Sequence, residues 1–270
     1  MTMPNFNYII AGNEVTITGY KGSATEVIIP SEIEGKPVTW VRYGTFKNHV
    51  NLTSVTIPNS VTSIETSTFK CCRSLKSVTI GNSVTSIGAF AFCDCSSLKR
   101  IMIPDSVTSI GDFAFHGCNS LKSITIPNSV KSIGRYTFEK CSSLISVTIP
   151  DSVTSIGSGA FHGCTSLTSV TLPSSVTSIG FCAFNRCTSL TSVMIPDTVT
   201  SISEGAFAYC SSLASVTIPE SVTWIGDAAF EGCSSLKDVY YLGTKEQWEK
   251  IAIDRHNYEL GKTTLHIKNA

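Results

Sequence analysis

The sequence predicts a repeat solenoid, mainly β with short helical or 3-10 turns, and two observations carry this prediction. Leucine recurs every 23 residues from Leu52 to Leu236, without insertion or deletion. Phenylalanine keeps the same period from Phe46 to Phe230. Copies of one supersecondary unit bury their apolar edges against their neighbours, so this strict period excludes two separate globular domains. We expect residues 24–238 to form about nine to ten stacked coils in a right-handed, curved superhelix.

Each unit begins with a strand pattern. In residues 121–127 the first, fourth and sixth places are apolar, while the intervening Ser and Thr point to the opposite face. Proline closes this strand in most units because it cannot continue a hydrogen-bonded ladder. Residues 129–134 supply two more apolar side chains and predict a second short strand before a glycine turn. A brief helical turn around the Phe and Cys is expected to complete the coil.

The two ends depart from the repeat, as a solenoid requires if its terminal coils are to be covered. Residues 1–23 are expected to form an N-terminal β-hairpin cap with its turn at residues 11–14. Residues 239–270 are expected to form a C-terminal cap. There Thr244 and Gln247 have capping-box spacing, which predicts a short helix carrying Trp248 over the last coil, followed by a strand near residues 265–267. Trp40 and Trp224 share one repeat position and are expected to pack beneath the caps.

The composition narrows the classes of partner. The chain has 270 residues, of which 42% are hydrophobic, and 20 basic residues balance 20 acidic ones. Only 15% of the residues are charged, so neither a nucleic-acid partner nor insertion into a membrane is expected. No stretch approaches the roughly 18 apolar residues of a membrane span. Residues 1–11 lack a basic region followed by an apolar core, so we expect no signal peptide in this chain.

Eight cysteines recur with the 23-residue period: Cys72, Cys95, Cys118, Cys141, Cys164, Cys187, Cys210 and Cys233. Equivalent positions on stacked coils run in a line, whereas a zinc site needs about four ligands around one point. We interpret this ladder as buried core thiols, because cysteine packs as a small hydrophobe. Disulfides and metal binding remain the alternatives. Adjacent coils lie about 4.8 Å apart where strands pair, a separation that a disulfide tolerates. Cys93 and Cys182 lie outside the ladder and are expected to be the most reactive thiols.

No constellation of catalytic residues is found. The histidines are scattered, and His116 and His162, which share a repeat position, lie two coils apart. No nucleophile and base pair with a suitable acid, and no phosphate-binding glycine loop leads from a strand into a helix. We therefore expect a protein that is not an enzyme, with no catalytic residue, no cofactor and no bound metal.

The exposed positions that depart from the Ser/Thr background are the candidates for a binding site. Lysine occupies the first exposed strand position of three successive units, at Lys76, Lys99 and Lys122, and the middle unit adds Arg100 and Met102. These five residues predict a basic ligand-binding surface with an apolar centre. The alternative is a solubilising stripe, since exposed strands often carry lysine to prevent edge pairing.

Charge is also distributed unevenly along the chain. Residues 50–141 contain nine basic and five acidic residues, a balance of +4, whereas residues 142–236 contain one basic and six acidic residues, a balance of −5. This asymmetry predicts a dipolar solenoid that could orient an encounter with a charged protein or favour weak head-to-tail self-association.

The whole phrase from Ser143 to Cys164, repeated in every full unit, closely resembles the repeat of the BspA-like leucine-rich-repeat proteins. The ends of the chain are also similar to that family's ends, at residues 15–20, at residues 35–38, and at residues 239–241 followed by Trp248. The resemblance implies bacterial or protist proteins that are exposed at the cell surface or secreted and that adhere to host proteins or other cells. It implies no enzyme, and it transfers no binding residue.

We therefore predict a non-catalytic binding or adhesion module, extracellular or at the cell surface. Its ligand would be a protein or a glycan, such as a component of the host extracellular matrix or of another cell surface, held on the exposed strand face. A structural spacer or self-associating scaffold is the alternative. A weaker alternative is ice or ordered-water binding by the Ser/Thr rows. Arg100, Met102 and Met194 interrupt those rows, which disfavours this alternative.

Overall fold

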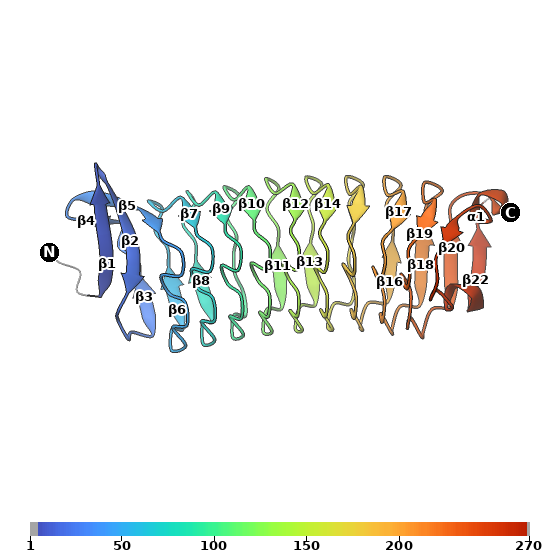
Figure 1. The fold of residues 1–270 in the computed structure, drawn as a ribbon, viewed down its shortest axis with the longest axis horizontal. Coiled ribbons are helices and arrows are strands. Elements are labelled where there is room, and N and C mark those ends of the chain that lie inside the picture. The colour runs from blue at the N-terminus through green and yellow to red at the C-terminus, as the bar shows by residue number, and fades with distance from the viewer. Residues whose placement is uncertain (1–4, 269–270) are drawn as a thin grey trace.

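The computed structural model describes residues 5–268. The chain forms a mainly β solenoid of about eleven turns with almost no helix, as the repeat predicts. Its coils stand side by side along the long axis of the molecule, with β1 (Phe6–Ala11) at one end and β22 (Thr264–Ile267) at the other (Figure 1). No helix within residues 5–268 is both long and apolar enough to cross a membrane.

The predicted first strand of the repeat builds one side of the solenoid, here called the first face. Equivalent residues of neighbouring coils pair in parallel, as where Val55 lies opposite Val78. The strands of this face are β3 (Glu26–Ile28), β6 (Ser54–Thr56), β8 (Ser77–Thr79), β11 (Ser123–Thr125), β13 (Ser146–Thr148), β16 (Ser192–Met194), β18 (Ser215–Ile218), β20 (Asp238–Tyr241) and β22 (Thr264–Ile267). Their alternating burial follows the two-residue period of a strand: Val78 is buried, and Ser77 and Thr79 are exposed.

The predicted second strand builds another side, the second face. Its strands are β2 (Glu14–Tyr20), β5 (Lys36–Val41), β7 (Ser63–Ile64), β9 (Ser86–Ile87), β10 (Ser109–Ile110), β12 (Ser132–Ile133), β14 (Ser155–Ile156), β15 (Ser178–Ile179), β17 (Ser201–Ile202), β19 (Trp224–Ile225) and β21 (Ala252–Ile253). At the N-terminal end β1 (Phe6–Ala11) pairs antiparallel with β2, and β4 (Glu32–Ile33) pairs antiparallel with β5. The remaining pairings on this face are parallel.

The segment around each Phe and Cys differs from the expected helical turn. In a typical coil Tyr136 and Lys140 have positive φ angles of 54° and 59°, a conformation that cannot be repeated as a right-handed helix. The backbone N–H groups alternate instead. Those of Tyr136, Phe138 and Lys140 donate to carbonyls of the next coil, whereas that of Cys141 closes a turn onto Phe138. This side of the solenoid is therefore a third ladder of hydrogen bonds between coils.

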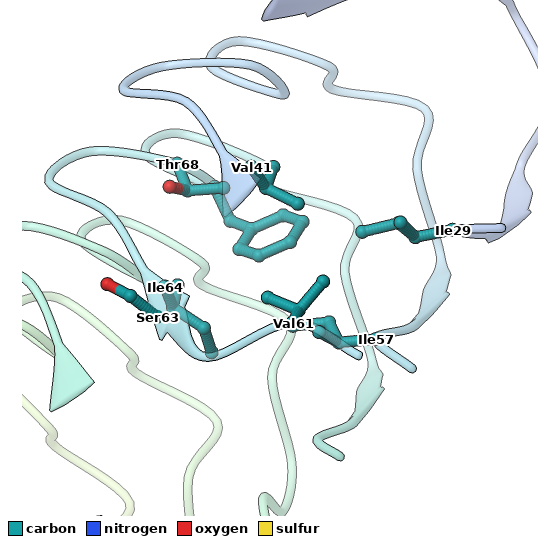
Figure 2. Close-up of a pocket in the computed structure, with 8 residues that line it drawn as sticks. Ile29, Val41, Ile57, Val61, Ser63, Ile64 and Thr68 are labelled. Carbon is teal, nitrogen blue, oxygen red and sulfur yellow. The ribbon is translucent and has the colours of Figure 1, made fainter. Parts of the chain in front are cut away.

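A continuous row of stacked phenylalanines occupies the core. Nine rings, from Phe46 to Phe230, are fully buried. Ring centroids of successive coils lie 5.2 to 5.6 Å apart, within the range at which aromatic pairs attract. Figure 2 shows the interior near the N-terminal end, where Ile29, Val41 and Val61 point into one space. That space has no room for a water molecule.

At the C-terminal end a short helix, α1 (Lys245–Trp248), follows the last full coil. The expected capping box is present, because Thr244 Oγ1 accepts from the Gln247 N–H while the Gln247 side chain accepts from the Thr244 N–H. The Trp248 ring lies edge-on to Tyr241, with centroids 5.2 Å apart. A 3-10 turn, η1 (Leu260–Lys262), leads to β22. Residues 1–4 and 269–270 of the two expected caps lie outside the described residues.

The prediction that Trp40 and Trp224 pack beneath the caps is wrong. Both side chains stand on the second face, where they are 45% and 37% exposed. Each occupies a strand position whose side chain points outward, as the exposed Trp224 and buried Ile225 of β19 show. The two-residue period of the strand therefore decides their direction, whichever coil they belong to.

The phenylalanine row predicts a large cost for removing one ring from the middle of the stack. We expect Phe138→Ala to lower the free energy of unfolding by about 3 to 5 kcal/mol, since neither the coil before nor the coil after can collapse into the gap. The exposed Thr148→Ala should change it by less than about 0.5 kcal/mol. Urea denaturation followed by circular dichroism measures both values. Equal values for the two variants would contradict a supporting role for the row.

Candidate functional site

The structure brings the five predicted ligand-binding residues together on the first face. Lys76, Lys99, Arg100 and Lys122 are exposed, and Met102 is 84% exposed, the highest value among the large hydrophobic side chains. We call Lys76, Lys99, Arg100, Met102 and Lys122 the basic surface. Its residues come from three successive coils.

Backbone hydrogen bonds hold the three lysines in a row. The N–H of Lys99 donates to the carbonyl of Lys76 at 3.4 Å, and the N–H of Lys122 donates to that of Lys99 at 3.4 Å. Within residues 5–268 no ion pair forms to Lys76, Lys99, Arg100 or Lys122. Four cationic groups therefore share a small area without an intramolecular counterion, which favours an anionic ligand.

Two adjoining depressions mark the basic surface. The first, of about 510 Å³, is lined by Lys76, Ser77, Lys99, Arg100, Lys122 and Ser123. The second, of about 370 Å³, shares Arg100 and Ser123 with the first and is lined by Met102 as well. The coil that carries Arg100 and Met102 has no strand on the first face, which interrupts the sheet between β8 and β11. The surface is thus a shallow, open groove, suited to contact with a macromolecule rather than enclosure of a small substrate.

The cysteine ladder is a set of core thiols, as predicted. All eight ladder cysteines are fully buried and unbridged. Each thiol donates to the carbonyl of a Phe 26 residues earlier, as Cys141 Sγ does to Phe115 at 3.2 Å. Burial raises the pKa of Cys141 to about 12. Within residues 5–268 no group of three or more His, Cys, Asp or Glu side chains is placed to hold a metal ion.

The expectation that Cys93 is a reactive thiol is wrong. Its side chain is 3% exposed, and burial, together with the neighbouring Asp94, raises its pKa to about 12. The half-buried thiols are those of Cys71 and Cys182. Burial raises the pKa of Cys182 as well, so neither Cys93 nor Cys182 resembles an activated nucleophile.

The two histidines that share a repeat position lie in different environments. His116 Nδ1 is 3.0 Å from Glu139 Oε2 on the next coil. At His162 burial lowers the pKa. Within residues 5–268 neither ring forms a hydrogen bond with a serine or cysteine side chain.

A second aromatic row, which the sequence reasoning missed, runs along the turn side. Phe90, Phe113 and Tyr136 stack with centroids 4.7 and 4.9 Å apart, and Lys70 Nζ lies 4.7 Å from the Phe90 ring centroid. A Cβ at Gly159 would overlap the Tyr136 ring, which extends into the place of the next side chain. Phe113 lies between two rings, and the Phe90 ring lies between Lys70 Nζ and Phe113, so this row stabilises the stack.

The fold and surface define a leucine-rich-repeat solenoid, a class of scaffold that generally binds other molecules on exposed faces and does not catalyse reactions. Residues 39–165 and 131–258 match the family described as BspA type Leucine rich repeat region, in six copies. These matches cover most of the chain, so the protein belongs to this family. No match was found among curated proteins.

Two solved structures are similar to this chain. A leucine rich cell surface protein from Faecalibacterium prausnitzii A2-165 is 30% identical, with 94% of this chain and 97% of that chain covered and a TM-score of 0.57. A leucine-rich repeat protein from Bacteroides ovatus ATCC 8483 is 24% identical, with coverages of 100% and 79% and a TM-score of 0.70. The second likeness concerns the fold alone.

Thiol reactivity tests the burial of the ladder. At about pH 8 a thiol with a pKa near 12 is ionised in only about one molecule in ten thousand, and the thiolate is the nucleophile. We expect a thiol-specific reagent to label only Cys71 and Cys182 in the folded protein, and the nine buried cysteines only after denaturation. Mass spectrometry of digested, labelled protein identifies the sites. Fast labelling of Cys141 without unfolding would contradict the core assignment.

Proposed function

We propose that this protein is a non-catalytic binding module, secreted or exposed at the cell surface, that holds a protein or glycan through the basic surface. The observation that carries the proposal is the row of Lys76, Lys99 and Lys122, flanked by Arg100, without an intramolecular counterion. An anionic ligand would supply the missing charge, and Met102 would supply apolar contact at the centre.

The location at the cell surface is proposed from the relative in Faecalibacterium prausnitzii, whose description is that of a cell surface protein. That likeness extends over nearly the whole of both chains. Host extracellular-matrix components and the surfaces of other cells are the ligands that such a location would offer.

Self-association is the second candidate function, and the charge distribution favours it. The basic half of the solenoid, residues 50–141, and the acidic half, residues 142–236, could attract one another between molecules placed head to tail. Sedimentation velocity over a concentration series tests this version. A single monomeric species at every concentration would remove it.

Charge reversal tests the basic surface. On an array of extracellular-matrix proteins and glycans, we expect the ligand to bind Lys99→Glu about tenfold more weakly than the parent protein, because a repulsive charge replaces an attractive one. The matched control is Lys237→Glu, which changes an exposed lysine at the same repeat position far along the stack. It should bind within about twofold of the parent.

Salt provides an independent readout of the same interaction. Raising the ionic strength from about 0.1 M to about 1 M shortens the Debye length from about 10 Å to about 3 Å and should weaken binding. A variant with Glu at all three lysines that bound as tightly as the parent would show that the site lies elsewhere.

A further inference from the structure

A second cluster of unusual side chains lies on the second face at the N-terminal end. A row of paired residues crosses four neighbouring strands there, with Ile9 of β1 opposite Thr16 of β2, Thr16 opposite Trp40 of β5, and Trp40 opposite Ser63 of β7. We call Ile9, Thr16, Trp40, Arg42, Tyr43 and Glu65 the Trp40 corner. Together with Thr18 they line a shallow, open depression of about 410 Å³.

Several residues of the Trp40 corner differ from the residues at the same repeat position in other coils. Arg42 and Glu65 occupy a position that is glycine in most other coils: Gly88, Gly111, Gly134, Gly157, Gly180 and Gly226. Glycine is needed there because a Cβ at Gly88 would lie 2.6 Å from the Thr66 backbone nitrogen of the preceding coil. Trp40 likewise stands where coils between the ends carry serine, from Ser63 to Ser201. Two charged side chains thus replace structural glycines beside an aromatic one.

The side chains of the corner are available to a ligand. Trp40 is 45% exposed, Tyr43 59% and Ile9 54%. Glu65 Oε1 accepts from Ser63 Oγ at 2.8 Å, which orients the carboxylate and leaves Oε2 free to accept. Arg42 forms no ion pair with Glu65 or with any other residue of the range 5–268. By contrast, Trp224 at the other end donates its indole N–H to Asp254 at 3.0 Å.

We propose that the Trp40 corner binds a neutral glycan, with a sugar ring stacked on the Trp40 indole. A pyranose has an apolar C–H face and a rim of hydroxyl groups that both donate and accept. The exposed aromatic rings match the C–H face. Arg42 offers only donors and ionised Glu65 only acceptors, so the pair can satisfy both roles of one or two hydroxyls. The Thr16 and Thr18 hydroxyls border the same depression.

The charges of the corner select a neutral ligand. One cation and one anion face the same depression, so a sulfated or otherwise acidic glycan would gain from Arg42 what it lost to Glu65. The basic surface has the opposite property. It lies on the first face and shares no residue with the Trp40 corner, so this site is separate from the proposed function and can succeed or fail independently of it.

Titration of the protein with a panel of free neutral oligosaccharides tests the proposal. For a shallow site we expect dissociation constants on the order of 1 mM. Trp40→Ala should weaken binding about tenfold or more, because it removes the stacking platform. The matched control is Trp224→Ala, which removes an exposed tryptophan from the same repeat position and should leave binding within about twofold.

Nuclear magnetic resonance of the three indole N–H groups locates the contact. The bound sugar should shift the Trp40 signal and leave the Trp224 and Trp248 signals unmoved. Since Trp40→Ala could loosen the N-terminal end, Tyr43→Ala and Arg42→Ala provide second variants whose side chains are exposed. Their thermal unfolding should match that of the parent protein while their affinity falls.

Three results would overturn the proposal. One is that no neutral oligosaccharide of the panel binds in free solution, including the case in which only acidic glycans bind in a salt-dependent way. Another is glycan binding that Trp40→Ala, Tyr43→Ala and Arg42→Ala all leave unchanged. The third is a protein ligand whose binding depends on Trp40, found together with an indole N–H signal of Trp40 that neutral glycans do not shift.

Discussion

Backbone hydrogen bonding between neighbouring coils, whose equivalent residues are 23 positions apart, is the constraint on which the rest of this structure depends. On the first and second faces the bonds join strands, and on the turn side they join alternate N–H groups of one coil to carbonyls of the next. A backbone group that lost its partner would cost free energy, so no coil can shift its phase. Identical residues are therefore superposed, which aligns the phenylalanine rings and gives each thiol of the cysteine ladder a carbonyl acceptor.

This constraint also determines where specificity can arise. Interior positions vary little, as where Val78 is followed one coil later by Ile101, because a close-packed core tolerates only small changes in volume. Exposed positions are free to change, and the basic surface and the Trp40 corner are both places where they do. The row of Phe90, Phe113 and Tyr136 also departs from the background, yet its rings stack on one another. A departure thus becomes a site only where neighbouring groups leave its chemistry accessible.

Much of the fold could be predicted because the repeat averages the signal over many copies. Both strands of the coil, the burial of the cysteine ladder and the capping box at Thr244 are present. The prediction of a helical turn was wrong because the 23-residue period does not reveal backbone angles. Residues such as Tyr136 usually favour negative φ, yet φ is positive there. Cys93 was misjudged because its position outside the ladder resembled a surface position, although Asp94 and the neighbouring coil bury it.

The sequence by itself determined the period, the composition of the buried rows and the grouping of Lys76, Lys99 and Lys122, since residues one period apart must become neighbours in a stack. Only the tertiary structure decided that Trp40 points outward and that Ile9 and Thr16 of the N-terminal hairpin lie beside it. Ile9 and Thr16 lie outside the regular repeat, so the 23-residue period does not determine which residues neighbour them. Strand pairing in three dimensions does, because it sets which side chains share one face.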